Sequence, residues 1–312
     1  MISGCRNLSS IPTAEDNFIV VPPINLQVIT AHDASILIQW DYVGAVGFSY
    51  YNVYYGTNKS HLNLESQSYT NSFYVDSLSY DSTYYFQVTA VYANGDESGP
   101  SNIVSAKPIN YFTPQPPVGL VVQGHNDNSG KYMTVVWSAN TDGDLAGYEV
   151  YRDTTSTFQP DTMSFTNLVA TQKTVIFKDT TGLVLGKEYY YKIIAFDFVH
   201  WRSTPSSPDS DMILARPTLV SPSNGAAITG LGIFLFKYNE FPGASGYIVY
   251  VSSSATVGDV FSATVPAGQD SLIYTGSSLN SNQQYFWHVA AYTQDPNTPN
   301  SVSDVYSFIL TQ

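Results

Sequence analysis

The sequence predicts an all-β protein made of three consecutive, related domains. Aromatic residues make up 14% of the 312 residues, with 25 tyrosines, whereas only 12% are charged. This composition is typical of packed strands. Apolar and polar residues alternate with a period of two in several segments, and one spaced pattern occurs three times. A chain of this length is also expected to divide into more than one core.

The repeated pattern is a leucine, a tyrosine six residues later and an alanine six residues after that. It occurs at Leu78–Tyr84–Ala90, Leu183–Tyr189–Ala195 and Leu279–Tyr285–Ala291, with the tyrosines 105 and 96 residues apart. Between each tyrosine and its alanine, every second residue is apolar. Strict alternation predicts a strand that has one face in a core.

Two further elements precede each copy of this strand. The first is Tyr-x-Val-Tyr, at 51–54, 148–151 and 247–250. The second lies upstream of it and is an apolar strand that ends in a large aromatic residue, at Trp40, Trp137 and Tyr238. Each copy opens with proline, at Pro22, Pro116 and Pro217. The start of a strand tolerates the missing N–H of proline.

Together these elements resemble the fibronectin type III domain over residues 20–312. The resemblance implies three immunoglobulin-like antiparallel β-sandwiches of seven strands in an elongated array, with Tyr84, Tyr189 and Tyr285 at the tyrosine corner. The expected divisions are a tether at 1–19, a first domain at 20–108, a linker with the second domain at 109–215, and a third domain at 216–312. Because almost no linker precedes Pro217, we expect a stiffer joint between the second and third domains than between the first and second.

Charge narrows the possible partners. Lysine and arginine total 12 against 25 acidic residues, for a formal charge of −13. Nucleic-acid binding requires clustered basic residues, and attachment to anionic lipid requires the same. We therefore expect no nucleic-acid partner. No apolar run reaches the ~18 residues of a membrane-spanning helix.

The single cysteine, Cys5, permits no intrachain disulfide. Residues 2–5 resemble the end of a bacterial lipoprotein signal peptide, in which small residues precede the lipidated cysteine, and the polar residues 6–17 would follow as a tether. This predicts membrane attachment only through a lipid on Cys5. An inert thiol and an intermolecular disulfide are the alternatives.

The residues offer little for catalysis. The five histidines are dispersed over the three domains, and metal-ligand spacings, glycine-rich phosphate loops and nucleophile elbows are absent from the sequence. The prediction is a non-enzyme with no cofactor and no metal.

One loop cluster is a candidate ligand site. The loops after the second and sixth strands lie at the same end of this family's sandwich. In the second domain they carry Asp142, Asp144, Asp197, His200 and Trp201. These side chains could bind calcium, or a sugar by aromatic stacking. Alternatively, Asp144 and Asp197 accept backbone N–H bonds that hold the turns, and Trp201 covers the end of the sandwich.

A second candidate is a row of outward-facing aromatic residues on the third and sixth strands. By alternation the set is Tyr54 and Tyr85, Tyr151 and Tyr190, and Tyr250 and Phe286. Such pairs can stabilise a sheet by ~0.2–1 kcal/mol each. They could also form stacking platforms for polysaccharide or for the apolar surface of a partner.

The function predicted is a non-catalytic adhesion or scaffold protein on the bacterial cell surface, anchored as a lipoprotein or else secreted. Its expected partners are other surface proteins or polysaccharide, docked on loops or edge strands. One alternative is a carbohydrate-binding accessory in extracellular polysaccharide capture. The other is a structural subunit of a surface filament, which requires self-association.

Overall fold

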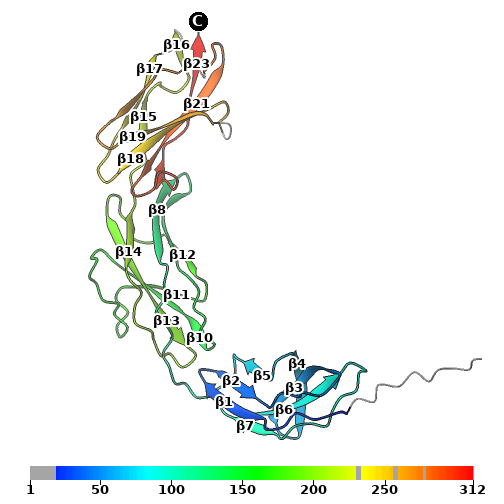
Figure 1. Cartoon of the computed structure of the whole chain (residues 1–312). Coiled ribbons are helices and arrows are strands. Elements are labelled where there is room, and N and C mark those ends of the chain that lie inside the picture. Colours follow the sequence, from blue (N-terminus) through cyan, green and yellow to red (C-terminus); the bar gives the residue numbers. More distant parts are fainter. Residues whose placement is uncertain (1–18, 230–232, 256–258, 277–278, 312) are drawn as a thin grey trace, which may run out of the picture. The chain divides into compact units, whose positions relative to one another are not determined.

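The computed structural model describes residues 19–229, 233–255, 259–276 and 279–311, and all regular elements in these ranges are β-strands (Figure 1). The all-β sandwich class predicted from the sequence is confirmed. Contacts divide the chain into two compact units, residues 1–112 with 142–144 and residues 113–141 with 145–312. The domain boundaries drawn from the repeats remain predictions.

The first unit is a sandwich of two antiparallel sheets. One sheet has the order β1-β2-β5 and the other β4-β3-β6-β7. The bounds are β1 Gln27–His32, β2 Ser35–Gln39, β3 Phe48–Asn58, β4 His61–Ser68, β5 Ser72–Val75, β6 Tyr84–Tyr92 and β7 Val104–Ala106. The segment that follows β7 returns to this sandwich, since Asp33 Oδ1 accepts hydrogen bonds from the backbone nitrogens of Tyr111 (2.8 Å) and Phe112 (2.9 Å).

The second unit contains two sandwiches. In the first of them, strands β11-β10-β13-β14 form one sheet and β12-β9-β8 contribute the other. The bounds are β8 Val121–Asp127, β9 Gly130–Val136, β10 Leu145–Asp153, β11 Leu168–Gln172, β12 Ile176–Asp179, β13 Glu188–Asp197 and β14 Asp209–Met212.

The last sandwich pairs the sheet β15-β17-β20 with strands β19-β18-β21, which continue into β22 and β23. Strand β16 runs parallel to β23. The bounds are β15 Thr218–Ser221, β16 Ala226–Thr229, β17 Phe234–Asn239, β18 Gly246–Ser252, β19 Asp259–Pro266, β20 Ser271–Tyr274, β21 Gln284–Tyr292, β22 Ser301–Val302 and β23 Tyr306–Thr311.

The same aromatic pair lies in all three cores. The Trp40 and Tyr51 rings are 5.1 Å apart, and the Trp137 and Tyr148 rings 5.3 Å apart, both edge to face. In the third core Tyr238 takes the place of the tryptophan, 4.9 Å from Tyr247. These rings are almost completely buried. The aromatic residue that ends the second strand therefore packs on the tyrosine that opens the Tyr-x-Val-Tyr segment.

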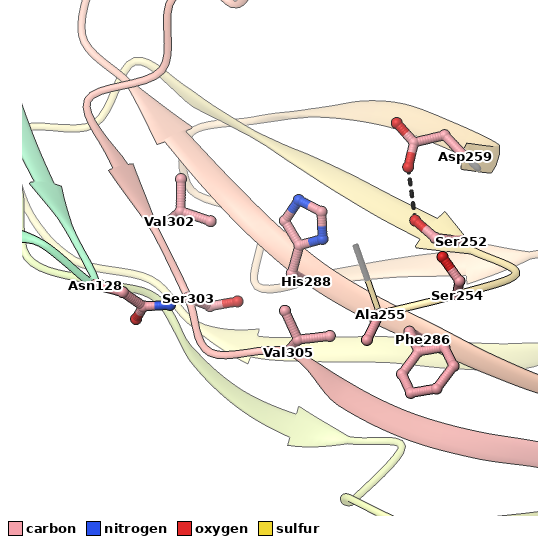
Figure 2. A pocket seen from close by; sticks show the side chains of 10 residues that line it. All are labelled: Asn128, Ser252, Ser254, Ala255, Asp259, Phe286, His288, Val302, Ser303 and Val305. Atoms are coloured by element: carbon pink, nitrogen blue, oxygen red, sulfur yellow. Dashed lines mark hydrogen bonds between the residues drawn. The ribbon is translucent and has the colours of Figure 1, made fainter. Parts of the chain in front are cut away.

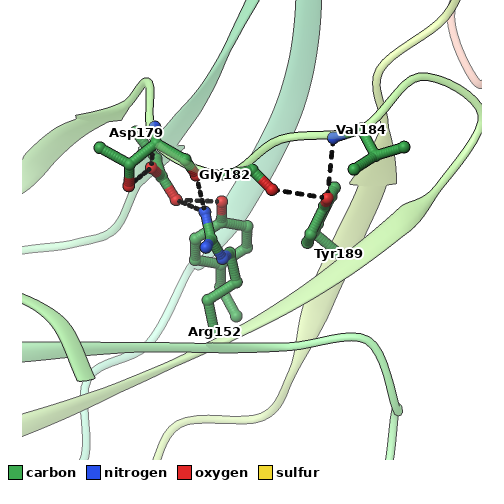
Figure 3. Close-up of polar contacts among 7 residues, drawn as sticks. Arg152, Asp179, Gly182, Val184 and Tyr189 are labelled. Carbon is green, nitrogen blue, oxygen red and sulfur yellow. Dashed lines mark hydrogen bonds and ion pairs between the residues drawn. The ribbon is translucent and has the colours of Figure 1, made fainter. Parts of the chain in front are cut away.

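The tyrosine corner is also present three times. The phenol oxygen of Tyr84, Tyr189 and Tyr285 accepts a hydrogen bond from the backbone nitrogen five residues earlier, at 3.0, 2.9 and 2.7 Å. Figure 3 shows the second copy, in which Val184 is the donor and Tyr189 in turn donates to the Gly182 carbonyl oxygen at 3.2 Å. The predicted role of these tyrosines is confirmed.

A serine that the sequence reasoning missed recurs with the same regularity. The hydroxyls of Ser101, Ser206 and Ser303 accept the backbone N–H of the sixth strand at Val88, Ile193 and Val289, at 3.0, 3.0 and 2.9 Å. Each serine lies 13 or 14 residues after the strand residue that it serves. This position, read across the three copies, was the signal available in the sequence.

Candidate functional site

Asp197, from the predicted loop cluster, holds a turn. Its Oδ1 atom accepts the backbone N–H of Val199 at 2.9 Å and of Trp201 at 2.8 Å, and its side chain is fully buried. A short polar side chain that bonds nearby backbone nitrogens is typical of a turn. Asp197 therefore has the second of its two predicted roles, that of holding the turn. Its buried carboxylate is not open to a ligand.

The other members of the cluster are arranged differently. His200 is exposed, has a φ of 67° and stacks on Phe196 with ring centroids 5.8 Å apart. Trp201 is 47% exposed, so much of its ring faces solvent. Asp144 is buried and Asp142 half-buried, and contacts group both with the first unit. Among the described residues, no group of three His, Cys, Asp or Glu could hold a metal ion.

The predicted aromatic row requires a correction at Tyr151. This side chain is fully buried, because the loop between β10 and β11 folds over it and places Phe158 against Tyr151 and Ile194. The other five members, Tyr54, Tyr85, Tyr190, Tyr250 and Phe286, are half-buried. Alternation correctly predicted that Tyr151 lies on the outer face of its strand. It could not predict that a loop covers this face, because the residues of the strand do not depend on that loop.

The aromatic residues of the row do not lie directly opposite one another. Tyr54 lies opposite Gln87, Tyr151 opposite Lys192 and Tyr250 opposite His288. The aromatic residues of the sixth strand, Tyr85, Tyr190 and Phe286, are two residues further along and face Gly56, Asp153 and Ser252. The outer face therefore carries diagonal neighbours in place of direct aromatic pairs.

The proposed lipidation site, Cys5, lies outside the described residues. Within the described ranges, the structure contains no helix that is long and apolar enough to cross a membrane.

The most extensive polar arrangement lies where the two sandwiches of the second unit meet. Strand β22 of the last sandwich pairs in parallel with β8 of the preceding one, with Ser301 opposite Asn126. The Asn126 backbone nitrogen donates to the Asn300 carbonyl oxygen at 2.7 Å. The pairing joins strands of both sandwiches into one nine-stranded sheet. We call this contact, together with the side chains around it, the junction.

Asp211, at the end of β14, is the centre of the junction. Its carboxylate accepts the backbone N–H of Gly124 at 2.9 Å, the hydroxyl of Thr293 at 2.7 Å and the amide of Asn300 at 2.5 Å. Gly124 belongs to the preceding sandwich and the other two donors to the last one. Asp211 is 5% exposed and Asn300 2%. The Met212 N–H also donates to this carboxylate, at 2.8 Å, so a buried carboxylate with four donors ties three segments together.

Arg216 adds a second set of bonds at the edge of the junction. Its Nε donates to the Val302 carbonyl oxygen at 2.6 Å, and its Nη2 to Asn128 at 2.7 Å and Asp304 at 2.9 Å. The absence of a linker before Pro217 was the one sign of this contact in the sequence. The bonding residues themselves were not identified from sequence.

Comparison with known proteins agrees with this architecture. Residues 21–107 match the family profile "Fibronectin type III domain". The first sandwich is therefore a fibronectin type III domain, as the resemblance implied.

Two further similarities extend over more of the chain. Over 235 residues, or 71% of this chain, the sequence is 28% identical to Exoglucanase B of Cellulomonas fimi, of which the match covers only 19%. The crystal structure of the chicken CNTN1 FN1–FN3 domains aligns with 93% of this chain and 99% of that one, at a TM-score of 0.41 and 14% identity.

Proposed function

We propose that this chain is a non-catalytic extracellular scaffold that holds other parts of a surface or secreted assembly at a fixed separation. The junction is the observation that carries the proposal. Two domains joined only by a peptide linker move independently by default, unless their interface is extensive. Here a strand pairing and a buried carboxylate connect them.

The extracellular setting is supported by the similarity to an exoglucanase. A polysaccharide-degrading system needs non-catalytic segments that position its working parts. Adhesion, through surface proteins or polysaccharide bound on loops and edge strands, is the finer form of the same proposal. Membrane attachment through a lipid on Cys5 is a separate component of it.

Distance measurement by pulsed electron paramagnetic resonance tests the rigid junction. Spin labels would replace Lys173 and Gln269, two exposed turn residues of the two sandwiches, in a Cys5→Ser background. We expect one narrow distance distribution, as wide as that of a control pair at Lys173 and Lys187 within one sandwich. A distribution several times wider than the control would overturn the proposal.

Two further assays address its other parts. Release of reducing sugar from cellulose or xylan by the purified chain would contradict the non-catalytic assignment. For the anchor, the gene with its native leader would be expressed in a bacterium, and Cys5 analysed by mass spectrometry alongside membrane fractionation. Acyl chains on Cys5 are the expected result, and a bare thiol in a soluble protein would refute lipidation.

A further inference from the structure

The outer face of the third and sixth strands differs among the three sandwiches. In the first, Glu97 covers it and accepts hydrogen bonds from Asn52 at 3.0 Å and from the Tyr54 hydroxyl at 2.8 Å. In the second, the loop after β10 covers it, and Lys192 Nζ donates to the Phe158 carbonyl oxygen at 2.6 Å. In both sandwiches, other groups of the chain cover this face and bond its polar side chains.

In the last sandwich the described residues leave a cavity of about 370 Å³ over the same face (Figure 2). Its base comes from β18, β19 and β21, where Ser252 lies opposite both Phe286 and Asp259. One wall is the segment from Val302 to Val305, and Asn128 closes the end toward the preceding sandwich. The volume lies within the range of about 300–1,000 Å³ that is common for small-ligand sites.

Alternation explains why polar groups line this cavity. Tyr285, Trp287 and Val289 point into the core and are buried. The residues between them, Phe286 and His288, therefore point to the outer face. His288 stacks on Tyr250 with centroids 4.9 Å apart and planes at 14°, which fixes the imidazole ring.

The charges of the cavity disfavour an anionic ligand. Burial lowers the pKa of His288 below its ordinary value of 6.5, so the imidazole is neutral at pH 7 and offers one donor and one acceptor. The Asp259 carboxylate accepts a hydrogen bond from Ser252 at 2.6 Å and would repel an anion. An array of hydroxyl, imidazole, amide and carboxylate groups beside an aromatic ring matches the hydroxyls and the apolar face of a sugar.

A second hollow of about 370 Å³ has Asn128, Val302 and Ser303 as walls in common with the cavity. Arg216 lines this second hollow, and its guanidinium already bonds Asp304, Asn128 and the Val302 carbonyl oxygen. Its charge is therefore compensated, and the second hollow does not select an anion. We call these two hollows, which share three wall residues, the groove; together they offer room for more than one sugar unit.

We propose that this groove binds a short stretch of a neutral polysaccharide, with Phe286 against a sugar face and Asp259, His288 and Asn128 bonding the hydroxyls. The proposal goes beyond the scaffold function and does not depend on it. A rigid junction with no sugar binding would leave the scaffold intact, and sugar binding with a flexible junction would leave the groove intact.

Calorimetric titration of the whole chain with cellotetraose, xylotetraose and mannotetraose is the direct test. We expect at least one of them to bind with a Kd near 1 mM or tighter, a value of the order expected for an open groove with few contacts. Tetragalacturonate, an anion, should bind at least ten times more weakly. The proposal would be overturned if none of the three neutral sugars gave a binding signal. Binding of the cationic chitosan tetramer alone would overturn it in the same way.

Variants locate the binding. Phe286→Ala should weaken it at least tenfold, whereas Tyr85→Ala, the equivalent position in the first unit, should leave it unchanged. Asp259→Asn should weaken binding while retaining an acceptor for Ser252. If Phe286→Ala unfolds, nuclear magnetic resonance of the unmodified chain decides instead. Bound sugar must shift the His288 ring resonances, and binding that leaves them unmoved contradicts the assignment.

Discussion

Replacement of Asp211 by alanine should lower the free energy of unfolding and allow the two sandwiches of the second unit to unfold independently. The carboxylate is the acceptor for Gly124, Thr293 and Asn300. Without it, the Thr293 hydroxyl retains Asn300 Oδ1 at 3.0 Å, but the Gly124 N–H, the Asn300 amide and the Met212 N–H lose this acceptor. The Gly124 and Asn300 donors are held in the interior of the junction, where unmade hydrogen bonds are costly.

The magnitude follows from the two donors whose bonds are fully buried, the Gly124 N–H and the Asn300 amide. A buried polar group without a partner costs about 1–3 kcal/mol, so Asp211→Ala should lower the free energy of unfolding by about 2–6 kcal/mol. Asp304→Ala is the control, because Asp304 bonds Arg216 at the edge of the junction but its side chain is 74% exposed. An exposed ion pair contributes about 0–1 kcal/mol.

Urea denaturation followed by tryptophan fluorescence measures both effects. Trp137 and Trp287 lie in the cores of the two sandwiches and report on them separately in single-tryptophan variants. We expect the two transitions to coincide in the unmodified chain and to separate in Asp211→Ala. Equal stability of Asp211→Ala and Asp304→Ala, within about 0.5 kcal/mol, would refute the reasoning.

Two other predictions concern the tyrosine corner and pH. Tyr189→Phe leaves the Val184 N–H without its acceptor and should cost about 1–2 kcal/mol in urea denaturation, whereas Tyr190→Phe should stay within about 0.5 kcal/mol; equal losses would contradict the assignment. Burial lowers the pKa of His125 and His288. Below about pH 6.5 the unfolded chain therefore binds more protons than the folded one. The free energy of unfolding falls as the pH drops from there toward the pKa of the folded state. His288→Gln should reduce this slope between pH 7 and 5, and an unchanged slope would disprove the contribution.

The features predicted correctly from sequence are those set by short spacings. The tyrosine corner joins residues five apart, and its leucine and tyrosine are visible together in one segment. The alternation within each sixth strand likewise determines which side chains enter the core. Period and spacing are local properties, so a single sequence with three internal copies is enough to reveal them.

The features that were missed depend on distant segments. Asp211 bonds residues 82 to 89 positions away in the chain, and nothing in the residues around it marks the partner. The burial of Tyr151 results from a loop that follows its strand and reaches back over it. Asp197 was assigned two roles from sequence, and only the positions of the Val199 and Trp201 nitrogens decide between them.

The junction also bears on how such proteins diversify. Independent domains can be duplicated, deleted or exchanged one at a time, because each carries its own complete set of bonds. Here Asn126 and Asp211 of one sandwich find their partners in the next. Recombination that inserts a foreign domain after residue 215 would leave these groups unmatched. The pair of sandwiches is therefore the piece that can be inherited and rearranged as a whole.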